Sequence, residues 1–246
     1  TAASALPACR WCGRPGADWC CPQCGGRRMR AGVIGAARTA EELGRAFPGY
    51  PVRSSLGDRI LPDLPAGPAV VVATPGAEPV VDGGYGAALL LDGWALLSRP
   101  DLRAGEQTLR RWMNAASLVR SEGRVVVGAD AGLAPVQALI RWDPWGAAAR
   151  ELAERAEVGF APAVRMASLS GAPTGIAELV SGADLPAGAE LIGPVPVGDD
   201  GAQRMLIRVP RERGAELAAA LKVSAAGRSA RKAGDPIKIV LDPSEL

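Results

Sequence analysis

The chain has 246 residues, enough for one large domain or two modest ones, and its formal net charge is only +2. Hydrophobic residues make up 48% and charged residues 22% of the sequence, ordinary globular values that exclude a largely disordered chain. Many nucleic-acid-binding domains are strongly basic, and this chain is not. Any contact with DNA must therefore come from local patches of positive charge. Histidine is absent, which excludes imidazole bases and imidazole zinc ligands.

All five cysteines lie in the stretch CRWCGRPGADWCCPQCGG, from Cys9 to Gly26. Two CxxC pairs, Cys9 with Cys12 and Cys21 with Cys24, each offer two thiolates from one tight turn, as a tetrahedral zinc ion requires. The segment is too small to fold around a hydrophobic core, so it needs another source of stability, such as a bound metal ion. The spacing therefore predicts that these four cysteines are zinc ligands.

Other roles for this segment stay open. A redox dithiol is one alternative, although such CxxC sites lie at strand–helix junctions and none is predicted here. Cys20 is a spare thiol that could replace Cys21 as a ligand. Trp11 and Trp19 either cover the metal core or stack on a base or a partner. Two arginine-rich clusters are solvated faces or phosphate contacts: Arg27, Arg28 and Arg30, and near the end Arg228, Arg231 and Lys232.

After about residue 30 the pattern changes to alternating helices and strands. A capping-box signature at Thr39 and Glu42 predicts a helix that ends before Pro48. The segment 101–106 opens a second helix, whose apolar face includes Trp112. This order predicts an α/β fold with crossover helices. Short apolar runs bounded by turn residues predict buried strands of a parallel sheet at 69–73, 87–91 and 124–128.

The character of the sequence changes again near residues 141–145, where a second, α+β domain is predicted to begin. The Gly/Pro-rich stretch 181–201 is predicted to be a long loop. No apolar run reaches the ~20 residues of a membrane span, and no signal peptide is evident, which favours a cytoplasmic protein. Helices are predicted at 147–156, 176–180 and 212–222, and strands at 164–169, 204–209 and 237–241.

The sequence shows no machinery for ATP hydrolysis. A phosphate-binding loop of the form G-x-x-x-x-G-K-[ST] is absent, because the chain contains no Gly-Lys dipeptide. No carboxylate pair stands out for acid–base chemistry. The residues taken alone therefore predict that this chain is not a catalyst.

Several motifs, taken in order, make the chain resemble the C-terminal half of the replication restart protein PriA family, also called primosomal protein N′. They are CPQCGG, TAEELGRAFPGYPV, DLRAGE, GFAPAV, LIGPVPV and the terminal IKIVLDPSEL. The resemblance covers essentially the whole chain and implies an α/β fold in three parts. These are the second half of a zinc-binding module at 1–30, a degenerate second RecA-like helicase lobe at 31–143, and an α+β C-terminal domain at 144–246.

In this family eight cysteines bind two zinc ions through interleaved pairs. The resemblance therefore implies that Cys9 and Cys12 complete one site and Cys21 and Cys24 the other, with partner cysteines upstream of this chain. The start of the chain then looks like a cut rather than a natural N-terminus. Whether the four cysteines alone hold one zinc ion, or none stably, stays open.

The resemblance also indicates that the helicase motifs are degenerate. ATPGAEPVVDGGY at 73–85 stands where the family carries G-T-Q-M and K-G-H-x-F, which couple nucleotide state to DNA. NAASLVRS at 114–121 replaces Q-V-A-G-R-A-G-R and puts Leu118 and Ser121 at the two arginine positions. Charge stabilisation of phosphoryl transfer is thereby lost, unless a shifted register brings in Arg120. This pattern resembles the actinobacterial branch of the family.

The function implied is DNA replication restart. The chain would bind forked or branched DNA in a zinc-dependent manner and assemble the primosome, without helicase activity of its own and without binding ATP. The implied partners are single-stranded DNA-binding protein and primosome or helicase-loading proteins, in the cytoplasm at the nucleoid. One alternative is an ATP-dependent 3′ to 5′ DNA helicase whose ATP-binding loop lies upstream of this chain. Another is a zinc-ribbon interaction protein unrelated to replication.

Overall fold

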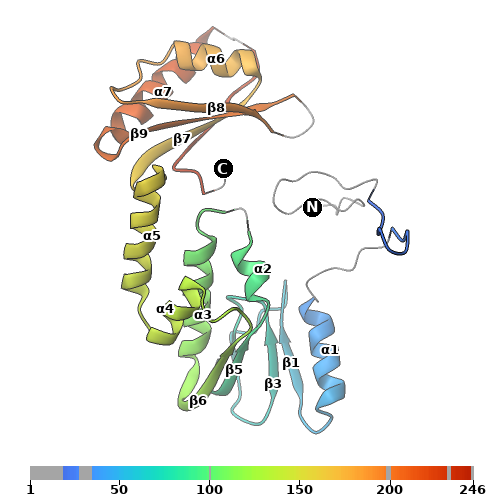
Figure 1. Ribbon diagram of the computed structural model, residues 1–246. Helices are drawn as coiled ribbons and strands as arrows, with labels where there is room; N and C mark the ends of the chain where they lie inside the picture. The colour runs from blue at the N-terminus through green and yellow to red at the C-terminus, as the bar shows by residue number, and fades with distance from the viewer. Residues whose placement is uncertain (1–18, 28–34, 100, 198–200, 232–233, 245–246) are drawn as a thin grey trace. The chain divides into compact units, whose positions relative to one another are not determined.

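The structure of the chain is a computed structural model (Figure 1), which describes residues 19–27, 35–99, 101–197, 201–231 and 234–244. The chain divides into two compact units, Thr1–Ala147 and Ala148–Leu246. Both units combine helices with strands, so the mixed α/β class predicted from the sequence is confirmed. In the described part of the chain, no helix is long and apolar enough to cross a membrane.

The first unit is built on parallel strand pairs. β1 (Val52–Ser55) pairs with β3 (Val70–Ala73), and β5 (Tyr85–Leu90) pairs with β6 (Val119–Val127). Figure 1 draws them in the order β6, β5, β3, β1. All three strands predicted for this region exist and run parallel to their partners. The prediction that they are buried is wrong for β5 and β6, which are mostly exposed, with Leu89 at 61% and Val126 at 54%. The hydrogen bonds among the described residues join the strands as separate pairs.

The core of the first unit lies between α3 (Ala104–Ser117) and α4 (Ala134–Arg141). The predicted apolar face of α3 is buried there through Leu109 and Trp112, and burial of such side chains stabilises a fold by about 25 cal/mol per Å². The cluster consists of Leu90, Leu96, Leu109, Trp112, Ala115, Val136, Ala138 and Leu139. Elements that were not predicted are α4, α2 (Gly93–Leu97), β1 and the parallel two-residue strands β2 (Asp63–Leu64) and β4 (Val80–Val81).

The first helix begins earlier than the sequence predicts. α1 (Ala36–Ala46) ends before Pro48 as expected, but its N-cap residue is Gly35. Thr39 lies inside the helix, where its hydroxyl donates to Gly35 O at 3.5 Å. The predicted capping box is therefore wrong, because the alanine-rich residues ahead of Thr39 are themselves good helix formers.

The second unit contains a four-stranded antiparallel sheet in the order β10-β7-β9-β8. Figure 1 labels its strands β7, β9 and β8 and the helices α6 and α7. Its core joins one face of the sheet to helices α6 and α7, through Ala167, Leu169, Ile207 and Val209 on the strands and Ile176, Leu179, Leu217 and Leu221 on the helices. The elements are α5 (Pro144–Val158), β7 (Val164–Gly171), α6 (Pro173–Ser181), β8 (Glu190–Pro196), β9 (Gln203–Pro210), the short 3₁₀ helix η1 (Arg211–Arg213), α7 (Gly214–Ala230) and β10 (Lys238–Leu241).

The stretch 181–201, predicted to be a long loop, contains the edge strand β8. All residues of β8 are exposed, so the strand lacks the alternation of buried and exposed positions that sequence patterns detect. Its register with β9 also shifts between Ile192 and Val195, across Gly193 and Pro194. The prediction of a loop is wrong because pairing with β9, rather than local sequence, forms this strand.

Candidate functional site

The second cysteine pair of the predicted zinc segment forms a closed turn. Gly25 N donates to Cys21 O at 2.8 Å, and Cys21 N donates to Gly26 O at 2.9 Å. Gly25 has a φ of +65°, a left-handed conformation that glycine adopts without strain. The chain therefore returns on itself directly after Cys24, which brings both thiols into one turn.

The same turn supports a thiolate at Cys21. Hydrogen bonds from the backbone of Cys24, and then of Gln23, lower the pKa of the Cys21 thiol. A Cβ at residue 26 would lie 3.3 Å from Sγ of Cys24, so Gly26 permits a close approach of the backbone to that sulfur. Cys-x2-Cys turns are a common source of two zinc ligands, and amides directed at sulfur are a usual support for such ligands. The residues present fit half of a tetrahedral zinc site.

The remaining predicted site residues are only partly described. Arg27 is exposed beside the cysteine turn. The described cysteines, Cys20 included, are free thiols. Within the described ranges no group of three Cys, His, Asp or Glu residues comes together that could hold a metal ion. Four predicted residues lie outside the described part: Cys9, Cys12, Arg28 and Arg30.

In the second arginine cluster, Arg228 is a core residue and not a phosphate contact. Its side chain is 7% exposed, and its guanidinium pairs with the carboxylate of Glu178 on α6. Nη2 also donates to Asp235 O at 3.4 Å. Arg228 thus ties α7 to α6 and to the segment before β10, which corrects the expectation of a solvated or phosphate-binding face. Arg231 is exposed, and Lys232 lies outside the described residues.

Leu118 and Ser121, which the resemblance matches to two arginine positions, lie at the junction of α3 and β6. Leu118 follows the last residue of α3, and Ser121 lies where the register between β5 and β6 shifts. Ser121 Oγ donates to Glu122 at 2.7 Å, and this bond is the main cause that lowers the pKa of the Glu122 carboxyl. The charged side chains described at this junction are thus the carboxylate of Glu122 and the guanidinium of Arg120 beside it. Arg120 lies against β5, since a Cβ at Gly86 would be 3.5 Å from its Nη2.

Residues 73–85, which the resemblance matches to a coupling motif, satisfy several of their polar groups internally. Gly76 N donates to both carboxylate oxygens of Glu78, at 2.9 and 3.0 Å. The Tyr85 hydroxyl donates to Pro79 O at 2.7 Å. Burial, and then the charge of Glu78, raise the pKa of Tyr85. These contacts hold the segment and occupy the Gly76 amide and the Tyr85 hydroxyl as donors.

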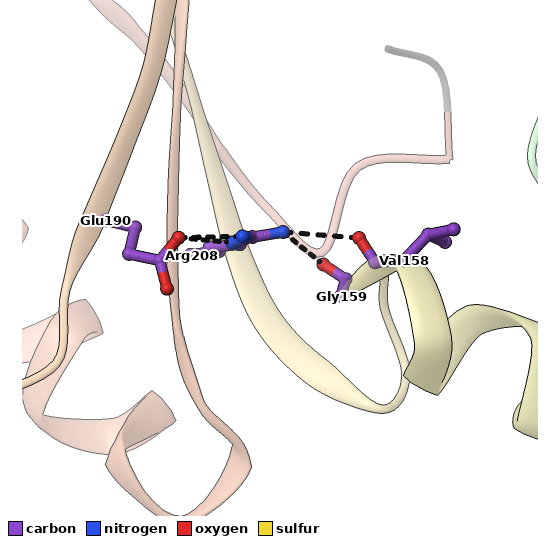
Figure 2. Close-up of polar contacts among 4 residues, drawn as sticks. All are labelled: Val158, Gly159, Glu190 and Arg208. Atoms are coloured by element: carbon purple, nitrogen blue, oxygen red, sulfur yellow. Dashed lines mark hydrogen bonds and ion pairs between the residues drawn. The ribbon is translucent and has the colours of Figure 1, made fainter.

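In the second unit, one arginine fastens α5 to the sheet (Figure 2). Arg208 on β9 donates to Glu190 from Nε and Nη2, and its Nη1 donates to Val158 O at 3.2 Å and Gly159 O at 3.4 Å. Gly159 has a φ of +67°, and a Cβ there would clash with Nη1 of Arg208. Sequence reasoning missed this network and ended the helix at residue 156, although a glycine such as Gly159, directly after the observed end of α5 at Val158, is a usual C-terminal signal.

These features define a mixed α/β protein with a cysteine turn suited to zinc and a compact C-terminal unit of one antiparallel sheet and its helices. Residues 156–244 match the family described as primosomal protein N C-terminal domain. That range contains the whole four-stranded sheet together with α6 and α7. The second unit therefore carries this domain.

The whole chain is similar to proteins named "Probable replication restart protein PriA". It is 51% identical to the Mycobacterium leprae protein over 252 residues, which cover 97% of the chain and 39% of that relative. It is 50% identical to the Mycobacterium tuberculosis and Mycobacterium bovis proteins over 259 residues, which cover 97% of the chain and 40% of each relative. The chain thus spans about two fifths of the length of these relatives. It is a homologue of part of PriA, and the resemblance read from the sequence is confirmed.

Proposed function

We propose that the chain is part of a DNA replication restart protein that binds forked or branched DNA and assembles the primosome, without helicase activity of its own. The observation that carries this proposal is the identity of about 50% over 97% of the chain to proteins named for replication restart. The domain matched at residues 156–244 is named for the primosome. Forked DNA, single-stranded DNA-binding protein and primosome or helicase-loading proteins are the proposed partners, at the nucleoid.

Zinc is proposed to be held by Cys21 and Cys24, together with Cys9 and Cys12 or with cysteines of a longer protein. The closed turn and the lowered pKa of the Cys21 thiol support this. When bound, zinc supplies the folding free energy of a segment too small to have a core. Arg27, Arg28 and Arg30 follow the cysteine pair in the sequence, and we propose that they contact DNA phosphates.

The lack of motor activity is proposed from the α3–β6 junction. Leu118 and Ser121 stand at the two arginine positions, and Ser121 is bonded to the Glu122 carboxylate. Arginines at such positions stabilise the charge that develops in phosphoryl transfer. Without them, this unit serves as a scaffold that binds no ATP. The second candidate is an ATP-dependent 3′ to 5′ helicase. This chain covers only 39% of the length of the Mycobacterium leprae relative, and an ATP-binding loop can lie in the length that it does not cover.

One experiment separates the two candidates. Fork binding and ATP hydrolysis are measured in the same zinc-loaded samples of the full-length protein, with and without forked DNA. Tight fork binding without stimulated hydrolysis is the expected result. Hydrolysis stimulated by the fork would overturn the scaffold proposal and establish the helicase.

The role of zinc is tested with matched cysteine variants. Cys24→Ser is expected to lose bound zinc and fork binding, whereas Cys20→Ser, which removes the neighbouring spare thiol, keeps both. Zinc content by atomic emission and fork affinity are the two readouts. Unchanged zinc content in Cys24→Ser would reject Cys24 as a ligand, and equal losses in Cys20→Ser would reject the choice of Cys21 over Cys20.

A further inference from the structure

The corner between α4 and α5 exposes two tryptophans. Trp142 is 53% exposed, Trp145 is 85% exposed, and Ile140, two residues before Trp142 in the sequence, is 66% exposed. Trp112, in contrast, is buried in the core of the first unit. A tryptophan carries a large apolar surface whose removal from water is favourable. A group of such side chains on the surface indicates a binding site rather than a part of the core.

The backbone does not explain the tryptophan at position 142. Trp142 ends α4 in a left-handed conformation, with a φ of +53°. Its N–H donates to Leu139 O at 3.1 Å, and the next N–H, of Asp143, donates to Ala138 O at 2.9 Å. Glycine is the usual residue at this position of a helix end, and a bulky side chain is unfavourable there. The indole at 142 therefore has a role other than shaping the turn.

Trp145 is held in place by the start of α5. Pro144 takes the first helical position, and the Asp143 carboxylate accepts the N–H of Gly146 at 2.8 Å as an N-cap. A Cβ at Gly146 would clash with that carboxylate, so the cap and the glycine fit each other. Leu139 before the corner and Ala147 after it pack into the core cluster. Both indoles thus stand on a fixed corner.

The corner carries one arginine that can contact an anionic ligand, next to one carboxylate. Arg141 is exposed and forms no ion pair with any described residue. Asp143 is the sole carboxylate between residues 138 and 147, and one of its oxygens already accepts the Gly146 amide. An arginine next to exposed aromatic faces is the combination found in sites for single-stranded nucleic acid.

The size of the patch favours bases over a protein partner. The two tryptophan side chains together offer roughly 300–500 Å². A standard protein interface buries about 800 Å² on each partner, and this patch falls short of that. One unpaired base, in contrast, needs only one indole face.

We propose that Trp142 and Trp145 stack on unpaired bases of single-stranded DNA, with Arg141 contacting the phosphate backbone beside them. This inference rests on the proposed role at forked DNA and names the DNA element that reaches this corner, the unpaired strand. Duplex DNA offers no free base face, because its bases are stacked on one another. The corner therefore discriminates unpaired from paired DNA.

The test uses fluorescence anisotropy with the zinc-loaded 246-residue chain. The probes are a labelled oligothymidylate of about 20 nucleotides, an abasic strand of equal length and a matched duplex. Stacking on one base contributes about 1–3 kcal/mol, which corresponds to about 5- to 150-fold in affinity. Trp142→Ala and Trp145→Ala are each expected to weaken oligothymidylate binding by at least about 5-fold, the double variant by more, and Trp145→Phe by less.

The controls separate stacking from damage to the fold. Trp94→Ala removes a half-exposed tryptophan elsewhere in the first unit and is expected to keep full affinity. Abasic and duplex binding are expected to be unchanged in all tryptophan variants. Arg141→Ala is expected to lower the slope of log affinity against log salt by about 0.7 for the single strand. Circular dichroism confirms that each variant is folded.

Unchanged oligothymidylate affinity in the double variant would overturn the inference. An equal loss for the oligothymidylate and the abasic strand would also overturn it, because a strand without bases cannot stack. A changed oligomeric state by light scattering, with DNA affinity intact, would assign the corner to a protein contact instead. The proposed function is judged separately, by fork binding of the wild-type chain. If the wild type binds forks, the proposed function stands even when one of these results overturns the stacking inference. If the wild type binds neither forks nor the oligothymidylate, both the proposed function and the stacking inference are overturned.

Discussion

Arg208 holds Glu190 by two hydrogen bonds to a single carboxylate oxygen, from Nε at 2.9 Å and from Nη2 at 2.7 Å. The third nitrogen of the same guanidinium donates to the carbonyls of Val158 and Gly159, at the end of α5 (Figure 2). Carbonyls at a helix C-terminus have no partner within the helix and attract positive charge. One arginine on β9 therefore joins the neighbouring strand β8 and the end of α5 to the sheet.

Removal of this arginine is expected to destabilise the second unit. We predict that Arg208→Ala lowers the free energy of unfolding by about 1–2 kcal/mol, because the helix-end carbonyls lose their donor. Glu190→Gln is expected to cost less than about 1 kcal/mol, since Glu190 is exposed and water screens the pair. Urea unfolding followed by circular dichroism measures both values. Arg211→Ala, at an exposed arginine just beyond β9, is the control, and a loss there as large as that of Arg208→Ala would contradict the prediction.

The glycine at position 159 is expected to be required for the same contact. Gly159→Ala places a Cβ in a left-handed conformation, which costs about 1–2 kcal/mol, and also displaces the Arg208 guanidinium. In the Arg208→Ala background only the backbone cost remains. A double-mutant cycle is therefore expected to show a smaller effect of Gly159→Ala when Arg208 is absent. Additive effects of the two substitutions would show that they do not share this contact.

Sequence patterns predicted those elements whose burial repeats along the chain. The face of α3 with Leu109 and Trp112 follows the helical period, and the apolar run of β3 is bounded by turn residues, so both were found. β8 was missed because it is an exposed edge strand interrupted at Gly193, and its pairing partner β9 is not visible in local sequence. Tertiary pairing, unlike periodicity, has no local signal.

The candidate site shows the same division. The spacing of Cys21 and Cys24 was enough to predict a metal turn, whereas the amides that lower the pKa of the Cys21 thiol depend on the backbone conformation. Arg228 was misread as part of a charged surface cluster. Its spacing from the buried residues Leu217 and Leu221 places it on the same face of α7 as they are. This periodicity indicates a buried position, whereas the charge of the side chain had suggested an exposed one.

Because Arg228 is buried and Arg231 is exposed, we expect substitutions at these two arginines to change the free energy of unfolding by different amounts. Arg228→Met keeps most of the apolar stem but loses the pair with Glu178, and we expect it to lower the free energy of unfolding by about 1–3 kcal/mol. Arg231→Met, three residues on and exposed, is expected to change it by less than about 0.5 kcal/mol. Chemical denaturation of both variants checks the difference. Equal effects would mean that Arg228 does not tie α7 to α6.

Tyr85 is expected to make stability depend on pH in the alkaline range. Its pKa is raised, first by burial and second by the charge of Glu78, so the folded chain holds the phenolic proton more tightly than the unfolded chain. This contribution is fully present below the ordinary tyrosine pKa and is lost as the pH rises through the raised value. The chain has two tyrosines, so in Tyr50→Phe the absorbance of phenolate reports Tyr85 alone.

In that variant we expect the titration midpoint of the folded chain to lie above that of the same chain in concentrated urea. Glu78→Gln is expected to lower the folded midpoint only part of the way, because burial is the larger cause. The substitution leaves the Tyr85 hydroxyl bonded to Pro79 O, so a complete return to the unfolded midpoint would mean that Glu78, rather than burial, sets the pKa. Coinciding folded and unfolded midpoints would show that Tyr85 is solvated and that residues 73–85 do not close over it.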